Sequence, residues 1–237
     1  MGTLLWTFRK GQTADGKEYA LSKRPRSPRA RPALITSLRH VRNLGASGIR
    51  SGSRVDRHVQ FVGSAIEVGS NFEALSGTVI ETLSYPGERI SIGEGVRLKR
   101  NVWLVSYGGS IDLGDGVLVG PATVVQGHGG VVIGTGTVLS PNVVIASATL
   151  AYWRPSGIEH LEHMLSEVRI GRNCWLGSNV VVSAGSIIGD GVVVAAQSFV
   201  SGELAPHTLY AGSPARPIRE ASMPPPSGSM GRLMSWE

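Results

Sequence analysis

The sequence is dominated by a repeat in which an aliphatic residue, often followed by Gly or another small residue, returns every six positions. The anchors of this repeat are Ile92, Leu98, Leu104, Leu113, Val119, Val125, Ile133, Leu139, Ile145, Ile170, Leu176, Val182, Ile188, Val194 and Val200. Two residues before each anchor stands a small or β-branched residue. Alternate residues of a strand face the same side, so each unit offers one large and one compact inward side chain. Such a short fixed period predicts an all-β solenoid, a parallel β-helix with three units per coil.

The repeat is accompanied by the C-terminal sequence Tyr210-Ala-Gly-Ser-Pro-Ala-Arg216-Pro-Ile-Arg219. Together they resemble the hexapeptide-repeat acyltransferases over roughly Val59 to Arg219. This resemblance implies a left-handed parallel β-helix, a homotrimer with sites between subunits, and acetyl-coenzyme A as the acyl donor. It also implies that the C-terminal segment leaves the prism and packs along its outside.

Three coils are longer than three six-residue units, and the extra residues always fall between the third anchor of one coil and the first anchor of the next. They lie at 105–112, 126–132 and 146–169. The three surpluses therefore stack at one vertex of the predicted prism. Loops on a rigid scaffold are where function concentrates, so we expect the active site at this vertex. It collects Asp112, His128, His160 and His163.

Acetyl transfer to a hydroxyl or amine needs a base that accepts the acceptor's proton, and histidine, with an unperturbed pKa near 6.5, suits this task. In the galactoside and maltose acetyltransferases the catalytic His follows the anchor before the long loop. The corresponding position here is Leu150, so the match to that branch fails. The arrangement of Asp112 and His128 is instead similar to serine acetyltransferase. That resemblance implies His128 as general base, Asp112 as its orienting residue, and His160 or His163 as a partner from the loop.

The family resemblance also implies where the donor lies, in a groove between subunits along the late coils. The matching positions for acetyl-coenzyme A are Trp175, Gly177, Ala195, Ala196, Ser213, Arg216 and Arg219. Arg216 and Arg219 are candidate partners for its phosphates, which a guanidinium fork fits well. In the 146–169 loop, Tyr152, Trp153 and Arg154 predict stacking or anion contacts with a small acceptor, such as a sugar.

Alternatives remain for most of these residues. His128 between two glycines fits an ordinary corner, Asp112 fits a turn cap, Trp175 fits outer-face packing, and residues 158–165 fit a short solvated helix. Two other functions are also open. One is a zinc lyase of the γ-carbonic-anhydrase kind, with His128, His160 and His163 as ligands. The other is a non-catalytic trimeric scaffold. The terminal motif favours the acyltransferase, for which we expect no metal.

The regions outside the regular repeat are assigned by composition. We expect a basic arm and a short helix from Pro32 to Leu44 within residues 1–50, irregular opening coils over 51–91, regular coils over 92–202, an outer-face segment over 203–222 and a mobile tail over 223–237. Residues 1–58 hold 13 Lys or Arg against three acidic residues. The arm lacks interleaved aromatic residues, so nucleic-acid binding is not expected.

Cellular location is inferred from what the sequence contains. No apolar run approaches the roughly 20 residues that span a bilayer, and the N-terminal sequence does not fit a secretory signal. The single Cys174 falls at a compact inward position, which predicts a buried side chain. A cytoplasmic protein is therefore expected.

Overall fold

The computed structural model describes residues 50–151 and 163–221. Within these ranges the regular secondary structure consists of strands β1 to β25, without a helix. This confirms the predicted all-β class. The expected arm, the helix from Pro32 to Leu44, residues 152–162 of the long loop and the C-terminal tail lie outside the described residues. No helix long and apolar enough to cross a membrane is present among the described residues.

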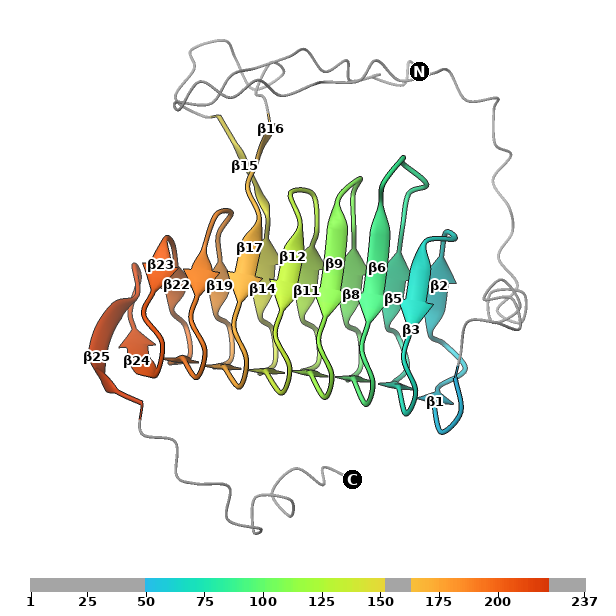
Figure 1. The fold of residues 1–237 in the computed structure, drawn as a ribbon, viewed down its shortest axis with the longest axis horizontal. Helices are drawn as coiled ribbons and strands as arrows, with labels where there is room; N and C mark the ends of the chain where they lie inside the picture. The colour runs from blue at the N-terminus through green and yellow to red at the C-terminus, as the bar shows by residue number, and fades with distance from the viewer. Residues whose placement is uncertain (1–49, 152–162, 222–237) are drawn as a thin grey trace. The chain divides into compact units, whose positions relative to one another are not determined.

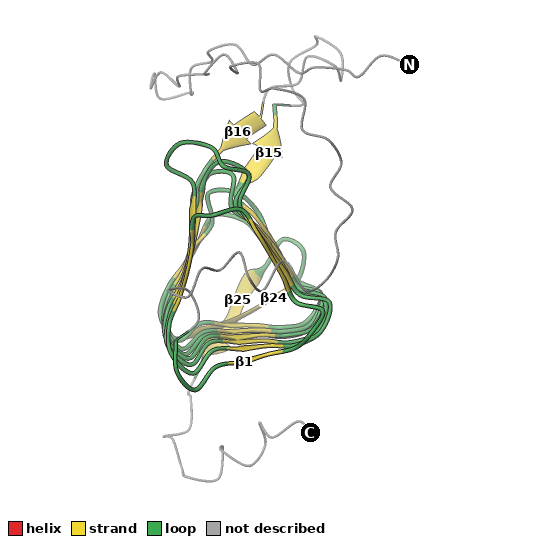
Figure 2. Cartoon of the chain, turned by 90° about the vertical axis from the view of Figure 1, so that its right-hand side faces the viewer, coloured by secondary structure: helices red, strands yellow, loops and turns green. Residues whose placement is uncertain are grey.

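Three long sheets form the faces of a prism, and Figure 2 views this prism along its axis. The base sheet contains β1 (Arg54–Val55), β4 (Glu73–Ala74), β7 (Arg97–Leu98), β10 (Leu118–Val119), β13 (Val138–Leu139), β18 (Trp175–Leu176), β21 (Val193–Val194), β24 (Thr208–Ala211) and β25 (Arg216–Glu220). The right-hand sheet contains β2 (Gln60–Val62), β5 (Val79–Glu81), β8 (Trp103–Val105), β11 (Val124–Gln126), β14 (Val144–Ala146), β19 (Val181–Val182) and β22 (Phe199–Val200). The left-hand sheet contains β3 (Ile66–Val68), β6 (Arg89–Ile92), β9 (Ser110–Leu113), β12 (Val131–Ile133), β17 (Val168–Ile170), β20 (Ile187–Ile188) and β23 (Glu203–Leu204). Separately, β15 (Ala148–Leu150) and β16 (His163–Leu165) form a two-stranded sheet.

The coil is left-handed, as expected. In Figure 1 the strands from β3 to β23 lie in front of those from β2 to β22, and the quarter turn to Figure 2 carries that front to the left. Seen from the N-terminal end, the chain passes from base to right to left while it recedes from the viewer. This counterclockwise path away from the viewer defines a left-handed helix of parallel strands.

The predicted inward positions form the core. Every anchor from Ile92 to Val200 is at most 3% exposed, and the compact positions two residues earlier are at most 2% exposed. Cys174 is among them, and burial raises the pKa of its thiol. Polar side chains in these positions bond to the backbone, as when the hydroxyl of Thr137 donates to the carbonyl of Gly171 at 2.8 Å. The hexapeptide period thus gives one continuous core, with its buried hydroxyls satisfied.

The opening coils are more regular than the sequence suggested. The strands from β1 to β6 stack in the same parallel register as later strands, with Phe61 opposite Ile80 and Ala74 opposite Leu98. In one opening coil the large and the small inward side chains have exchanged positions. Ala74 occupies the anchor position, and Phe72 occupies the compact position two residues before it. In β2, Phe61 is the buried residue and Val62 beside it is half-buried.

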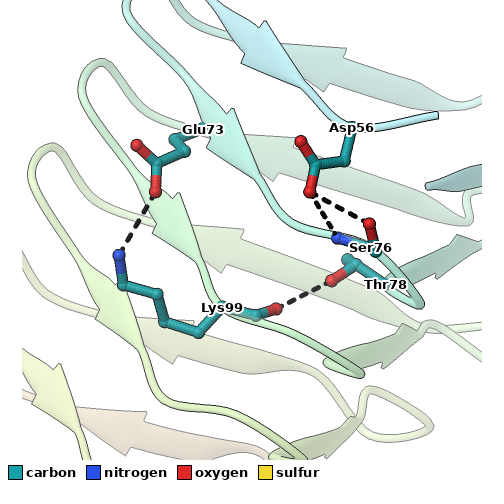
Figure 3. A network of polar contacts seen from close by, with 5 residues as sticks. All are labelled: Asp56, Glu73, Ser76, Thr78 and Lys99. Atoms are coloured by element: carbon teal, nitrogen blue, oxygen red, sulfur yellow. Dashed lines mark hydrogen bonds and ion pairs between the residues drawn. The ribbon is translucent and has the colours of Figure 1, made fainter. Parts of the chain in front are cut away.

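Side-chain contacts reinforce these opening coils (Figure 3). The carboxylate of Asp56 accepts hydrogen bonds from the backbone N–H and the hydroxyl of Ser76, each at 3.0 Å. These bonds lower the pKa of Asp56. Lys99 pairs with Glu73 at 3.2 Å, and the hydroxyl of Thr78 donates to the carbonyl of Lys99. Successive coils are thus linked on their outside as well as through the core.

The C-terminal segment differs from its expected course along the outside of the prism. Its strands β23 and β24 continue the stack in parallel on β20 and β21. Only β25 departs from the coil, by turning back antiparallel to β24. The segment therefore extends the solenoid and closes the end of the base sheet, where an exposed edge would invite association.

Candidate active site

The turns between the right-hand and left-hand sheets stack at the upper vertex of Figure 2. They include residues 82–88, 106–109 and 127–130, and the chain between β14 and β17 leaves from the same vertex. The predicted stacking of the inserted residues at one vertex is confirmed. The strand register places Ser106, Gly127 and Ser147 one above another at the start of these turns.

His128 lies in the turn between β11 and β12. Its side chain is half-buried, and its Nδ1 is enclosed. The backbone N–H of Gly129 donates to the hydroxyl of Ser147 at 2.9 Å, and that of Gly130 donates to the carbonyl of Gly127 at 2.9 Å. A Cβ on Gly129 would lie 2.5 Å from the carbonyl oxygen of Ser147. The glycines around His128 therefore allow neighbouring coils to approach, which fixes the backbone that carries the imidazole.

The ring of Tyr107, one coil earlier, stacks on His128. The two ring centroids are 4.2 Å apart, and the planes are inclined by 26°. The edge of Trp103 meets Tyr107 at a centroid distance of 6.3 Å. The indole N–H of Trp103 in turn donates to Glu81 at 3.3 Å. The imidazole thus belongs to a column of aromatic rings, which the sequence analysis did not identify.

A buried carboxylate supports the turn below His128. Glu88 is 5% exposed, and it accepts hydrogen bonds from the hydroxyl of Ser106, the backbone N–H of Gly108 at 3.1 Å, and that of Tyr85 at 2.9 Å. Burial alone raises the pKa of Glu88, but these bonds and another from the backbone of Leu83 outweigh it, and the pKa is lowered. Glu88 is therefore held as a carboxylate at neutral pH.

The carboxylate of Asp112 has a partner that the sequence did not suggest. It lies in β9, where its carboxylate accepts a hydrogen bond from Arg89 at 2.6 Å. The register places Asp112 beside Val132 of the next coil, on the outer face of the left-hand sheet. His128 stands in the turn before that strand. Asp112 thus bonds to Arg89 rather than to the imidazole, because strand alternation directs it onto the sheet face.

The residues expected from the long loop are only partly described. His163 lies in β16 and is exposed. His160, Tyr152, Trp153 and Arg154 lie outside the described residues. Across residues 50–151 and 163–221, no three His, Cys, Asp or Glu side chains gather closely enough to hold a metal ion.

The positions matched to acetyl-coenzyme A gather at the lower-right vertex and on the adjoining base sheet. Gly177 and Ala196 stack in successive turns, since a Cβ on Gly177 would lie 2.6 Å from the backbone nitrogen of Ala196. Ala195 precedes Ala196 in the same turn. Trp175 is 53% exposed on the base sheet, and its indole donates to the hydroxyl of Ser140 at 2.9 Å. Its contact fits outer-face packing, and its exposure also leaves it accessible to a ligand.

The strip from Ser213 to Arg216 continues this group. Phe199 donates its backbone N–H to the carbonyl of Gly212, and the N–H of Ala215 donates to the carbonyl of Phe199 at 2.7 Å. These bonds place the strip beside β22, at the next level of the lower-right vertex. Ser213, Arg216 and Arg219 are exposed. Within one chain, the width of the right-hand sheet separates this group from His128.

Comparison with known proteins finds relatives that are named as acetyltransferases. Residues 167–202 match the family model described as bacterial transferase hexapeptide (six repeats). The chain is 34% identical over 145 residues to WbbJ of Escherichia coli K12, which carries the name of a lipopolysaccharide biosynthesis O-acetyl transferase. This match covers 56% of the chain and 70% of WbbJ.

The chain is also 32% identical over 130 residues to the galactoside O-acetyltransferase of the same strain, a match that covers 55% of the chain and 63% of that protein. Across the relatives compared, the matched share of the relative's own length runs from 32% to 70%. Among solved structures, the N-acyltransferase AntD from Bacillus cereus, in complex with dTDP and 3-hydroxybutyryl-CoA, superposes with a TM-score of 0.55. That likeness, at 14% identity over 84% of this chain and 93% of AntD, concerns the fold.

Proposed function

The chain belongs to the hexapeptide-repeat acetyltransferases, and we propose that it transfers an acetyl group from acetyl-coenzyme A to a hydroxyl or amine of a small, sugar-like acceptor. The sugar class of acceptor is supported by the galactoside and lipopolysaccharide names of its relatives. The observation that carries the catalytic proposal is the fixed, half-buried His128 at the vertex where the inserted turns stack.

His128 acts as the general base in this proposal. One imidazole nitrogen takes the proton of the acceptor's hydroxyl or amine while that oxygen or nitrogen forms a bond to the thioester carbon. The carbonyl oxygen becomes an oxyanion, which a backbone N–H stabilises. When the carbon–sulfur bond breaks, the imidazolium returns the proton to the departing thiolate. Proton and charge balance without a covalent enzyme intermediate.

The other expected roles stay predictions. Asp112 can orient the imidazole only after Arg89 releases it, and a role for His160 or His163 depends on the long loop. The seven donor-contacting positions, and the acceptor contacts from Tyr152, Trp153 and Arg154, are likewise part of the proposal. So is a cytoplasmic location.

The site is completed between subunits of a homotrimer in this proposal. The outer face of the right-hand sheet carries a continuous uncharged stripe, formed by Val79, Trp103, Val124, Val144, Val181 and Phe199. The corresponding column of the left-hand sheet contains Glu67, Asp112, Arg169 and Glu203. An exposed apolar stripe of this kind marks an association surface.

The same assembly accounts for the separation of His128 from the donor-binding positions. If the right-hand sheets face a three-fold axis, the upper vertex of one subunit lies next to the lower-right vertex of its neighbour. His128 then borders the same groove between subunits as the strip from Ser213 to Arg216 of the adjacent chain, which lies several strands farther along the axis. Closed cyclic symmetry uses such head-to-tail contacts.

An acetyl-transfer assay tests the catalytic proposal. Release of free thiol from acetyl-coenzyme A is measured with a panel of sugars and amino sugars. We expect acceptor-dependent release that falls about 10²- to 10⁴-fold in His128→Ala, the usual range for loss of a general base. His58→Ala, which alters an exposed histidine on the opening coil, is the matched control and should keep full activity. Full activity in His128→Ala would overturn the assignment.

A further inference from the structure

The contact between Tyr107 and His128 restricts how the imidazole can be oriented. The rings are nearly parallel at 4.2 Å, so the phenol covers one face of the imidazole. A ring stacked on the imidazole limits it to orientations in one plane. Geometry of this kind decides whether a nitrogen can reach the acceptor's proton.

Tyr107 is itself held in an uncommon backbone conformation. Its φ is +48°, a left-handed conformation that bulky residues seldom adopt. The two residues that flank it, Ser106 and Gly108, both donate hydrogen bonds to the buried carboxylate of Glu88. The backbone N–H of Ser106 also donates to the carbonyl of Glu81 at 3.1 Å. The turn is thus fixed on both sides of Tyr107, and persistence of a disfavoured conformation requires such support.

The geometry points to Tyr107, clamped by Glu88, as a positioning residue that holds the imidazole of His128 in its reactive orientation. This inference rests on the proposed role of His128. The device spans three consecutive coils, because Glu88 precedes β6, Tyr107 precedes β9, and His128 precedes β12. Tyr107 acts through the aromatic face of its side chain, and its hydroxyl takes no part in the positioning.

Two substitutions separate the ring from the backbone. Tyr107→Phe keeps the aromatic face, whereas Tyr107→Asn removes it with a residue that tolerates positive φ. We expect Tyr107→Asn to lower kcat by about 10- to 100-fold, as expected for a misplaced catalytic group, with the KM for acetyl-coenzyme A unchanged. Tyr107→Phe should retain nearly full kcat. Equal kcat in the wild type and Tyr107→Asn would overturn the inference.

A spectroscopic measurement serves as an independent readout. The ring protons of His128, assigned in the NMR spectrum by their loss in His128→Ala, should show an upfield ring-current shift in the wild type and in Tyr107→Phe. That shift should disappear in Tyr107→Asn. Persistence of the shift in Tyr107→Asn would show that it does not come from the Tyr107 ring. Absence of the shift from the wild type would show that the rings do not stack in solution. Either result would overturn the inference.

The results also separate this inference from the proposed function. Full activity in His128→Ala would remove the catalytic role of His128, whatever the NMR spectra show. A strong loss in His128→Ala together with full activity in Tyr107→Asn would leave the general base in place and reject the positioning role. An unchanged KM for acetyl-coenzyme A would show that Tyr107→Asn is folded and assembled.

Discussion

Glu88 shows how much of the upper vertex depends on one buried charge. A carboxylate that is 5% exposed is costly unless hydrogen bonds compensate for its lost hydration. Here the donors come from its own turn and from the turn of the next coil. Removal of the charge leaves these donors with a weaker acceptor, so both turns lose part of their support.

The lowered pKa of Glu88 has a defined consequence for stability. Its folded-state pKa lies below the ordinary value of 4.5, so the unfolded chain binds this proton more readily than the folded chain. The stabilisation is therefore complete above about pH 4.5 and is lost as the pH falls through the lower, folded-state value. We expect Glu88→Gln to cost about 1.5 to 3 kcal/mol at pH 7, the usual worth of hydrogen bonds to a charged group.

Thermal unfolding at two pH values measures this effect. The melting temperature of Glu88→Gln should lie below that of the wild type at pH 7, and the difference should shrink at pH 3.5. A difference of the same size at both pH values would contradict the role of the charge.

Individual residues also show what the sequence could and could not predict. Cys174 and the anchor residues were predicted as buried because the period alone fixes which side chains face inward. The bond from Arg89 to Asp112 was not anticipated, because the spacing of Asp112 and His128 does not reveal that one lies on a sheet face and the other in a turn. Tyr107 was missed, although it stands at the same place in its coil as His128. Comparison of equivalent turn positions would have found it.

At the scale of the turns, glycine decides how closely adjacent coils can approach. Gly109 lies directly beneath the turn that carries His128. A Cβ there would fall 2.1 Å from the carbonyl oxygen of Gly127 and 2.5 Å from that of His128. Both neighbours are backbone atoms and cannot rotate away, so the upper turn must move.

Gly109→Ala is therefore expected to displace His128 without altering any side chain of the site. We expect a loss of about 1 to 3 kcal/mol in the free energy of unfolding, as for overpacking, and a fall in acetyl-transfer activity. Denaturant unfolding and the thiol-release assay measure the two effects. Gly116→Asn is the control, because Gly116 has a φ of +65° and open space around its Cβ direction. Unchanged stability in Gly109→Ala would contradict the close packing of these turns.

The coils also differ in how readily the sequence reveals them. Regular coils keep the large residue at the anchor and the compact residue before it, so the period is plain. Phe72 and Ala74 reverse that order, and Phe72 lies against Phe61 at a centroid distance of 6.5 Å. Hydrogen bonding between the backbones of neighbouring strands does not depend on side-chain size. The strands therefore continue to pair in the opening coils, where the hexapeptide pattern of the sequence is no longer regular.

At the scale of the whole molecule, the uncharged stripe of the right-hand sheet predicts the homotrimer. Val181→Glu places a charge within this stripe, where Val181 is 38% exposed, and should dissociate the trimer. Ile187→Glu is the matched control on the left-hand sheet, where Ile187 is 44% exposed. Analytical ultracentrifugation should show trimers for the wild type and Ile187→Glu, and smaller species for Val181→Glu. A monomeric wild type would reject the shared site.

An acetyl-coenzyme A-dependent transferase must bind its donor, and calorimetric titration of acetyl-coenzyme A into the intact protein measures that binding. We predict saturable binding of micromolar strength with one site per chain. No detectable binding over the same concentration range would contradict the proposed function.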